Sequence, residues 1–284
     1  MGIWKAIFGG KDLTAEEEQQ ERVEKNFDLL KYDGVKAMKM GQADYAVKCF
    51  NEALKLKDDL EVRDYLSQTL IRQGEFDEAT RQLELMASAE PDNQDILLQL
   101  ANVAYMAEDY ERLAEVCERA MAVRQDNETV CLFAARACVG KGEKDDALVL
   151  LDKAVALRDD YADARLQRGM LLLEEQRVEE ADADANWLMD YAGTHEDVIM
   201  FKAQIEKAKG NADEACRLYG MVIEQNPFST VAYRSRADLY RSMGRETEAE
   251  NDMAQAKEID PSQDVEDIEQ QVKQAYKNSS PFGV

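Results

Sequence analysis

The sequence predicts an all-α fold in which seven helix-turn-helix units stack into an α-α superhelix. A small residue recurs about every 34 positions, and a second small or apolar residue follows twelve later. A fixed period of this length is typical of repeat arrays, whose units bury their apolar faces by stacking on neighbours. Only four prolines and abundant Ala, Leu, Glu, Lys and Gln favour helix over strand. The first set is Gly34, Ser67, Ala101, Ala135, Gly169, Ala203 and Ala237, and the second is Ala46, Ala79, Leu113, Ala147, Ala181, Ala215 and Ala249.

Between the two small positions of each unit the sequence predicts a tight turn. Glycine holds the turn position in five units, and Glu108 and Gln176 replace it in the other two. Glycine just past a helix end adopts the left-handed conformation that closes the helix without a Cβ penalty. Three residues later an acid or threonine stands where we expect it to cap the second helix or to favour its N-terminal dipole. These second-helix residues are Asp44, Asp77, Glu111, Asp145, Glu179, Asp213 and Thr247.

This pattern closely resembles the tetratricopeptide repeat, a two-helix unit of about 34 residues. The resemblance covers residues 27–263, with units that begin near residues 27, 60, 94, 128, 162, 196 and 230. The alanine typical of the second helix is replaced only at Leu113, and Ala185 is undersized where the family has an aromatic or large apolar residue. Prolines that close a unit occur at Pro91, Pro227 and Pro261.

Segments of different character flank the repeats. Residues 1–26 comprise an apolar segment and a polar leading helix that begins at Thr14; residues 264–277 are predicted to cap the last repeat, and 278–284 to be a mobile tail. The capping helix places Val265, Ile268, Val272 and Tyr276 at three- and four-residue spacing. The apolar N-terminal residues Ile3, Trp4, Ile7 and Phe8 are too few to span a membrane. They could form a weak membrane or partner contact, or pack on the first repeat.

Charge and cysteine content narrow the class of protein. The net charge of −24 disfavours nucleic-acid binding, which requires a basic surface. The five cysteines form no zinc or redox motif and are best explained as small buried hydrophobes. With no signal peptide in this sequence, we expect a cytoplasmic protein.

The sequence favours a protein without catalytic activity, cofactor or metal. Asp159, Asp160 and Asp163 resemble the magnesium-diphosphate motif of prenyl-transferring enzymes, but a second such motif is missing from the sequence. His195 is the only histidine, so a nucleophile–base pair or a zinc-protease motif cannot be built around it. The acids at the start of the fifth unit are equally explained as stabilising a helix N-terminus.

The family resemblance implies that the first helix of each unit lines a concave groove that binds peptides. Carried over by position, the candidate groove residues are Lys31, Tyr65, Arg72, Leu98, Asn102, Tyr105, Phe133, Arg136, Met170, Met200, Phe201, Arg234 and Arg241. Tyr65, Phe133, Met170, Met200 and Phe201 would form an apolar strip typical of a binding surface, although such side chains could instead fill gaps between adjacent first helices. With the acids of the first helical turns set aside, basic residues outnumber acids over all the first-helix positions that the family exposes to the groove.

These features predict a non-catalytic protein–protein interaction module, an adaptor or assembly scaffold. Its partner would be a peptide or helix with apolar anchors and some acidic character, bound in the groove. The alternative is a self-associating or membrane-peripheral structural protein that uses the N-terminal apolar segment.

Overall fold

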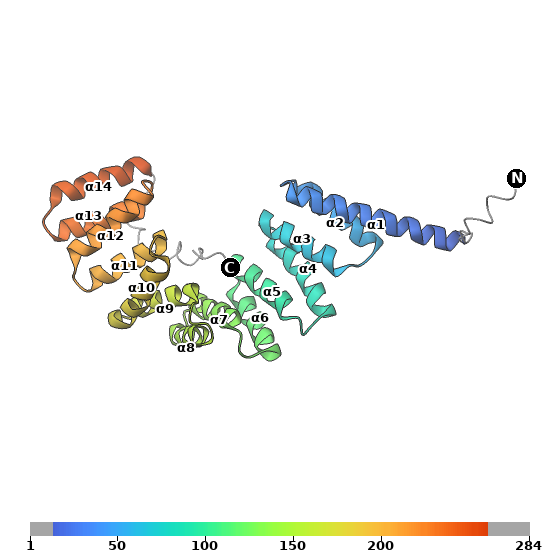
Figure 1. The fold of residues 1–284 in the computed structure, drawn as a ribbon, viewed down its shortest axis with the longest axis horizontal. Helices are drawn as coiled ribbons and strands as arrows, with labels where there is room; N and C mark the ends of the chain where they lie inside the picture. Colours follow the sequence, from blue (N-terminus) through green and yellow to red (C-terminus); the bar gives the residue numbers. More distant parts are fainter. Residues whose placement is uncertain (1–13, 261–284) are drawn as a thin grey trace. The chain divides into compact units, whose positions relative to one another are not determined.

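The computed structural model describes residues 14–260, which contain fourteen α-helices and no strand (Figure 1). The described chain divides into two compact units, unit 1 up to Arg124 and unit 2 from Gln125. Unit 1 contains α1 (Ala15–Lys39), α2 (Ala43–Leu56), α3 (Leu60–Gln73), α4 (Phe76–Ala89), α5 (Gln94–Met106) and α6 (Tyr110–Val123). Unit 2 contains α7 (Glu128–Lys141), α8 (Lys144–Leu157), α9 (Ala162–Glu174), α10 (Val178–Ala192), α11 (Glu196–Ala208), α12 (Ala212–Gln225), α13 (Thr230–Ser242) and α14 (Glu246–Ile259).

The helices form seven consecutive pairs, and the predicted register is confirmed. The first helices of the second to seventh pairs begin at residues 60, 94, 128, 162, 196 and 230. The first pair differs because α1 is a single helix of 25 residues that joins the leading polar helix to the first repeat. Thr14 caps it as predicted, with its hydroxyl accepting from the Glu17 amide at 3.2 Å. The predicted capping helix and tail lie outside the described residues.

The turns within the pairs adopt the left-handed conformation that the glycines predicted. Five glycines have φ between +72° and +82°, and Glu108 and Gln176 adopt the same region at +56° and +61°. The chain geometry of the repeat therefore imposes this conformation even where the residue carries a Cβ, which makes it unfavourable for the two non-glycine residues.

Replacing Glu108 by glycine should stabilise unit 1 by about 0.5–1 kcal/mol. Relief of the left-handed strain contributes about 1–2 kcal/mol, and the greater freedom of glycine in the unfolded chain offsets part of it. Urea unfolding of the variant and its parent measures the difference. The matched control is Gly74→Ala, at φ +77° with no atom within 4 Å of the added Cβ, which should lose stability through backbone strain alone. A destabilised Glu108→Gly variant would contradict this account.

The acids after each turn, and Thr247, lie two residues further into the second helix than the sequence suggested. The residues before the second helices are Gln42, Glu75, Asp109, Glu143, Arg177, Asn211 and Arg245. Asp44 and its equivalents therefore lie in the first helical turn and do not cap it. Their favourable position relative to the helix dipole remains, whereas the capping interpretation was wrong at these positions.

The small residues allow close packing, as predicted, but not always with the expected neighbour. A Cβ added to Gly34 would lie 2.5 Å from Phe50, on the second helix of the same repeat. A Cβ added to Gly169 would lie 2.5 Å from Phe201, on the first helix of the next repeat. In the fifth repeat the residue equivalent to Phe50 is the undersized Ala185, so Phe201 fills the space over Gly169 instead.

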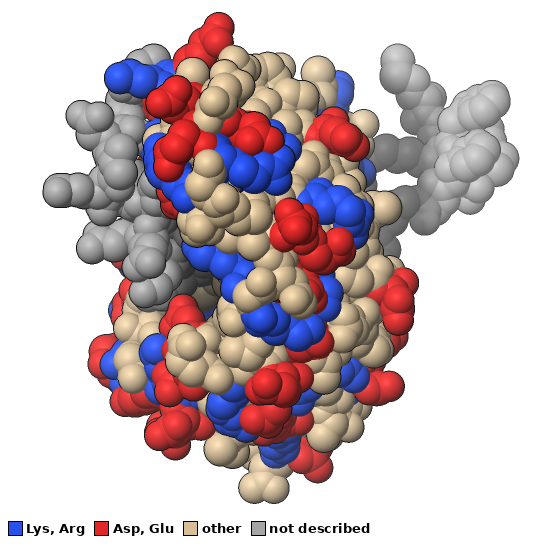
Figure 2. Space-filling model, turned by 90° about the vertical axis from the view of Figure 1, so that its left-hand side faces the viewer, with Lys and Arg blue, Asp and Glu red and all other residues tan. Residues whose placement is uncertain are grey.

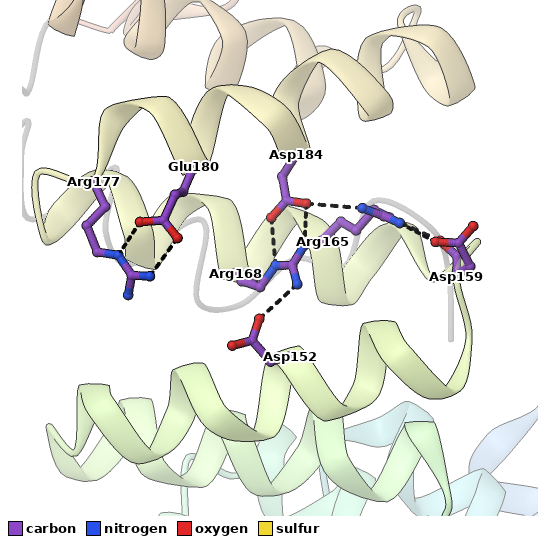
Figure 3. A network of polar contacts seen from close by, with 7 residues as sticks. All are labelled: Asp152, Asp159, Arg165, Arg168, Arg177, Glu180 and Asp184. Carbon is purple, nitrogen blue, oxygen red and sulfur yellow. Dashed lines mark hydrogen bonds and ion pairs between the residues drawn. The ribbon is translucent and has the colours of Figure 1, made fainter.

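A network of ion pairs joins α8, α9 and α10 in unit 2 (Figure 3). Its centre is Asp184, a carboxylate only 2% exposed. Arg168 donates to both of its oxygens, at 2.6 and 2.8 Å, and Arg165 donates to one of them at 3.2 Å. Arg165 also lies over the Trp187 ring, 4.5 Å from its centroid. The carboxylate is thus buried only because two guanidinium groups compensate it.

Candidate protein-binding surface

The candidate binding residues lie on the first helices of the pairs, as the family register predicts. They fall on α1, α3 and α5 in unit 1 and on α7, α9, α11 and α13 in unit 2. The two sets belong to different units, so each set is a surface in its own right.

In unit 1 the predicted residues remain accessible. Lys31, Tyr65, Leu98, Asn102 and Tyr105 are half-buried, and Arg72 is exposed. Helices α3 and α5 therefore carry aromatic and apolar side chains that are only partly buried, and α3 also carries the exposed guanidinium of Arg72. We call these six residues the unit 1 surface.

A polar cluster at one end of this surface orients Tyr65. Its hydroxyl donates to Glu61 at 2.8 Å, and its ring stacks on Phe50 with centroids 5.9 Å apart. Lys31 also binds Glu61 and lies 3.6 Å from Asp59. Hydrogen bonds from Lys31 and then Tyr65 lower the pKa of the Glu61 carboxyl, and the bond to Glu61 raises the pKa of the Tyr65 phenol. Tyr65 is thus held in place, while the charge of Lys31 is already balanced by acids of the chain.

In unit 2 most of the predicted residues are buried. Phe133, Met200 and Phe201 belong to the core, Met170 is half-buried, and Arg241 is exposed beside Asp238 at 3.0 Å. The apolar strip expected from the sequence is therefore narrower than its residue types suggested. Phe201 instead fills a gap between the first helices α9 and α11, which is the alternative stated in the sequence analysis.

Two of the three predicted arginines of unit 2 are buried as well. Arg136 and Arg234 are each less than a tenth exposed. The guanidinium of Arg136 lies 5.4 Å from the Phe133 ring centroid, and it donates to the Gln167 amide oxygen at 2.7 and 2.9 Å when that amide is oriented to accept. Arg136 thus has a packing role within α7 and α9, and the basic character inferred from it is not on an open surface.

In the acidic cluster considered as a metal motif, Asp159 is bound by the guanidinium of Arg165. Arg165 donates to a carboxylate oxygen of Asp159 at 2.5 Å and to its carbonyl oxygen at 3.0 Å. Asp163 is buried at the start of α9. Among residues 14–260 no group of three His, Cys, Asp or Glu side chains could hold a metal ion.

A surface depression of about 510 Å³ lies beside α12, α13 and α14 in unit 2 and was not anticipated from the sequence. Its basic residues are already matched by carboxylates: Arg217 binds Glu214, Arg236 binds Asp252, and Arg245 binds Glu248. The depression therefore offers no uncompensated positive charge to an anionic ligand. On the face drawn in Figure 2, basic and acidic side chains are likewise interleaved, without the basic stripe that a nucleic acid needs.

Paired helices, left-handed turns and small packing residues define the class of this molecule, a helical-repeat protein. Two family models described as tetratricopeptide repeat match residues 66–127 and 232–263. The chain is a tetratricopeptide-repeat protein. No curated protein sequence matches it. None of the helices in the described range is long and apolar enough to cross a membrane.

Several solved structures share the fold. PilW, described as a widely conserved type IV pilus biogenesis factor, aligns with a TM-score of 0.65 and 15% identity over 75% of this chain and 98% of its own. A tetratricopeptide repeat protein from Parabacteroides merdae aligns with a TM-score of 0.55 and 18% identity over 89% and 88%. YrrB, described as a TPR protein with an unusual peptide-binding site, aligns with a TM-score of 0.54 and 16% identity over 68% and 97%. At these identities the likeness concerns the fold.

Proposed function

We propose that this protein is a non-catalytic protein-interaction module, an adaptor or assembly scaffold that binds a peptide or helix on its first-helix surfaces. The observation that carries the proposal is the unit 1 surface, where Tyr65, Leu98 and Tyr105 are half-buried beside exposed Arg72. Aromatic and arginine side chains are the residues that most often anchor protein interfaces. The peptide-binding site described for YrrB supports a ligand of the same class.

The partner we propose carries apolar anchors and an acidic group placed to meet Arg72. Of the bases that suggested an acidic partner, Lys31 is paired with acids of the chain, and Arg136 and Arg234 are buried. Arg72 is therefore the base on which the proposal depends in unit 1. A single exposed charge contributes modestly to affinity and more to the rate of association.

Charge reversal at Arg72 tests this proposal. A peptide array with aromatic or leucine anchors and either acidic or basic flanks is first screened with the parent protein. Arg72→Glu should then weaken binding to the acidic members about fivefold, the effect of losing one exposed ion pair, and less at high salt. The matched control is Arg81→Glu on α4, an exposed arginine of the same repeat on its second helix. Equal losses in the two variants, or no acidic binder at all, would refute the proposed partner.

We also propose a cytoplasmic location. Cys49, Cys117, Cys131 and Cys216 are buried free thiols, and Cys138 is a partly buried one. Burial raises the pKa of the Cys131 and Cys216 thiols, which makes them poor nucleophiles. Unreactive free thiols in a cysteine-containing chain support a reducing compartment.

A further inference from the structure

One face of helix α1, in the first repeat, carries apolar side chains that no described residue covers. Leu29 is 58% exposed and Tyr32 is 65% exposed, and the two lie one helical turn apart on α1. Leu29 occupies the third position of its repeat. At the same position in the six later repeats the side chains are all buried: Val62, Ile96, Val130, Ala164, Val198 and Ala232.

Apart from Val130, which lies on the first helix of unit 2, these equivalent residues lie on helices that follow another repeat in the same unit. Helix α3 packs on α2, α5 on α4, and α9, α11 and α13 likewise on the helix before them. No described helix precedes α1, so Leu29 presents the packing side of a repeat to solvent. Terminal repeats of such arrays need a cover for this side. Further along the face, Lys36 is exposed where later repeats bury Thr69, Val103, Leu171, Ile205 and Leu239. Only the half of the face near Leu29 and Tyr32 therefore needs an apolar cover.

The chain carries a segment of suitable composition immediately before α1. Residues 1–13 include Ile3, Trp4, Ile7 and Phe8, followed by Gly9 and Gly10. The capping box at Thr14 ends the helix there: the Thr14 amide donates to Glu17 at 2.7 Å, and its backbone is extended, with φ −67° and ψ 160°. Helix α1 therefore begins at Ala15, and the glycine pair in the preceding sequence permits a reversal of direction.

The distances match. Leu29 and Tyr32 lie about 22 and 27 Å from Thr14 along the helix, at a rise of about 1.5 Å per residue. Six extended residues place Phe8 up to about 20 Å from Thr14. The residues nearer the start of the segment reach further, so residues 3–8 together can reach both Leu29 and Tyr32.

We propose that residues 1–13 fold back along α1 and cover Leu29 and Tyr32, so that the apolar N-terminal segment is the cap of the repeat array. Ile3, Trp4, Ile7 and Phe8 supply the apolar surface that a preceding repeat would supply elsewhere. This occupant is favoured over a second copy or a membrane because it is covalently tethered within reach, which gives it a high effective concentration at this face.

Trp4 reports on the contact. The Trp4→Phe variant emits only from Trp187. Subtracting its spectrum from that of the full chain therefore gives the fluorescence of Trp4. Leu29→Asp should shift the Trp4 emission to the red and increase its quenching by iodide, whereas Met40→Asp, an exposed apolar residue just past the end of α1, should change neither. Both substitutions are at solvent-exposed positions, so the variants should fold. Deleting residues 2–10 should lower the melting temperature of the parent and have a smaller effect in the Leu29→Asp background.

Three results would overturn the proposal. Trp4 could be as accessible in the parent as in Leu29→Asp. Its protection could grow with protein concentration alongside a dimer in sedimentation, which would make a second copy the occupant. It could also arise only with phosphatidylserine vesicles, which would make the segment a membrane contact.

Discussion

Replacing Asp184 by alanine should lower the free energy of unfolding of unit 2 by about 3–5 kcal/mol, the usual cost of removing one partner from a buried ion pair. Asp184 is 2% exposed, and the side chains of Arg165 and Arg168 are 12% and 18% exposed. Without the carboxylate, two poorly solvated guanidinium groups would face each other near the centre of the network. Their mutual repulsion adds to the loss of three charge-assisted hydrogen bonds.

Two neighbouring carboxylates provide controls, because they also bind arginines but are themselves exposed. Asp152 lies 2.9 Å from Arg168 and Glu180 lies 2.7 Å from Arg177, and both acids are more than half exposed (Figure 3). Asp152→Ala and Glu180→Ala should each cost about 1 kcal/mol or less. Urea unfolding monitored by the fluorescence of Trp187, which contacts Arg165, follows the relevant unit. An Asp184→Ala variant no less stable than these controls would show that burial does not make this network structurally important.

The architecture could be predicted from the sequence because the residues that determine it act locally and recur in every repeat. A small residue at a helix crossing and a glycine at a left-handed turn act within one helix pair, and seven occurrences average out single exceptions such as Glu108 and Leu113. The helix starts at residues 60, 94 and 128 accordingly agree with the predicted register. The exact start of a helix, by contrast, is set by local backbone geometry, and the capping interpretation of Asp44 was wrong by two residues.

The Asp184 network could not be predicted because it occurs once and joins residues of different helices. Arg165 and Arg168 lie 19 and 16 residues before Asp184. Analysis of apolar periodicity treats all three as surface residues, since charged side chains are rarely buried without partners. Only the packing of α9 against α10 shows that they meet.

The accessibility of a candidate binding residue depends on the size of the side chains around it, and its position in the repeat does not specify them. Tyr65 and Phe201 hold the same position in their repeats, yet Tyr65 is half-buried and Phe201 is fully buried. Phe50 occupies the space over Gly34 and leaves Tyr65 to stack on its outer side. In the fifth repeat Ala185 leaves the space over Gly169 empty, and Phe201 enters it. One undersized residue therefore changes a predicted surface aromatic into a core residue.

Replacing Phe201 by alanine should destabilise unit 2 by about 3–5 kcal/mol, the cost of removing a fully buried phenylalanine and leaving a cavity. The cavity would lie over Gly169, which has no side chain to fill it. Tyr65→Ala, the equivalent substitution in unit 1, should cost less because the ring is only half-buried, but it should weaken peptide binding.

The pair of variants distinguishes a core role from a binding role at the same repeat position. In the Phe201→Ala background, Gly169→Ala should recover part of the lost stability, because its Cβ enters the space that the ring has left and alanine favours the helix. In the parent the same Cβ would lie 2.5 Å from the Phe201 ring, so there Gly169→Ala should help less or destabilise. Urea unfolding of the four proteins measures this coupling. A Phe201→Ala variant that is as stable as the parent but binds peptide more weakly would instead make Phe201 an anchor of the binding surface.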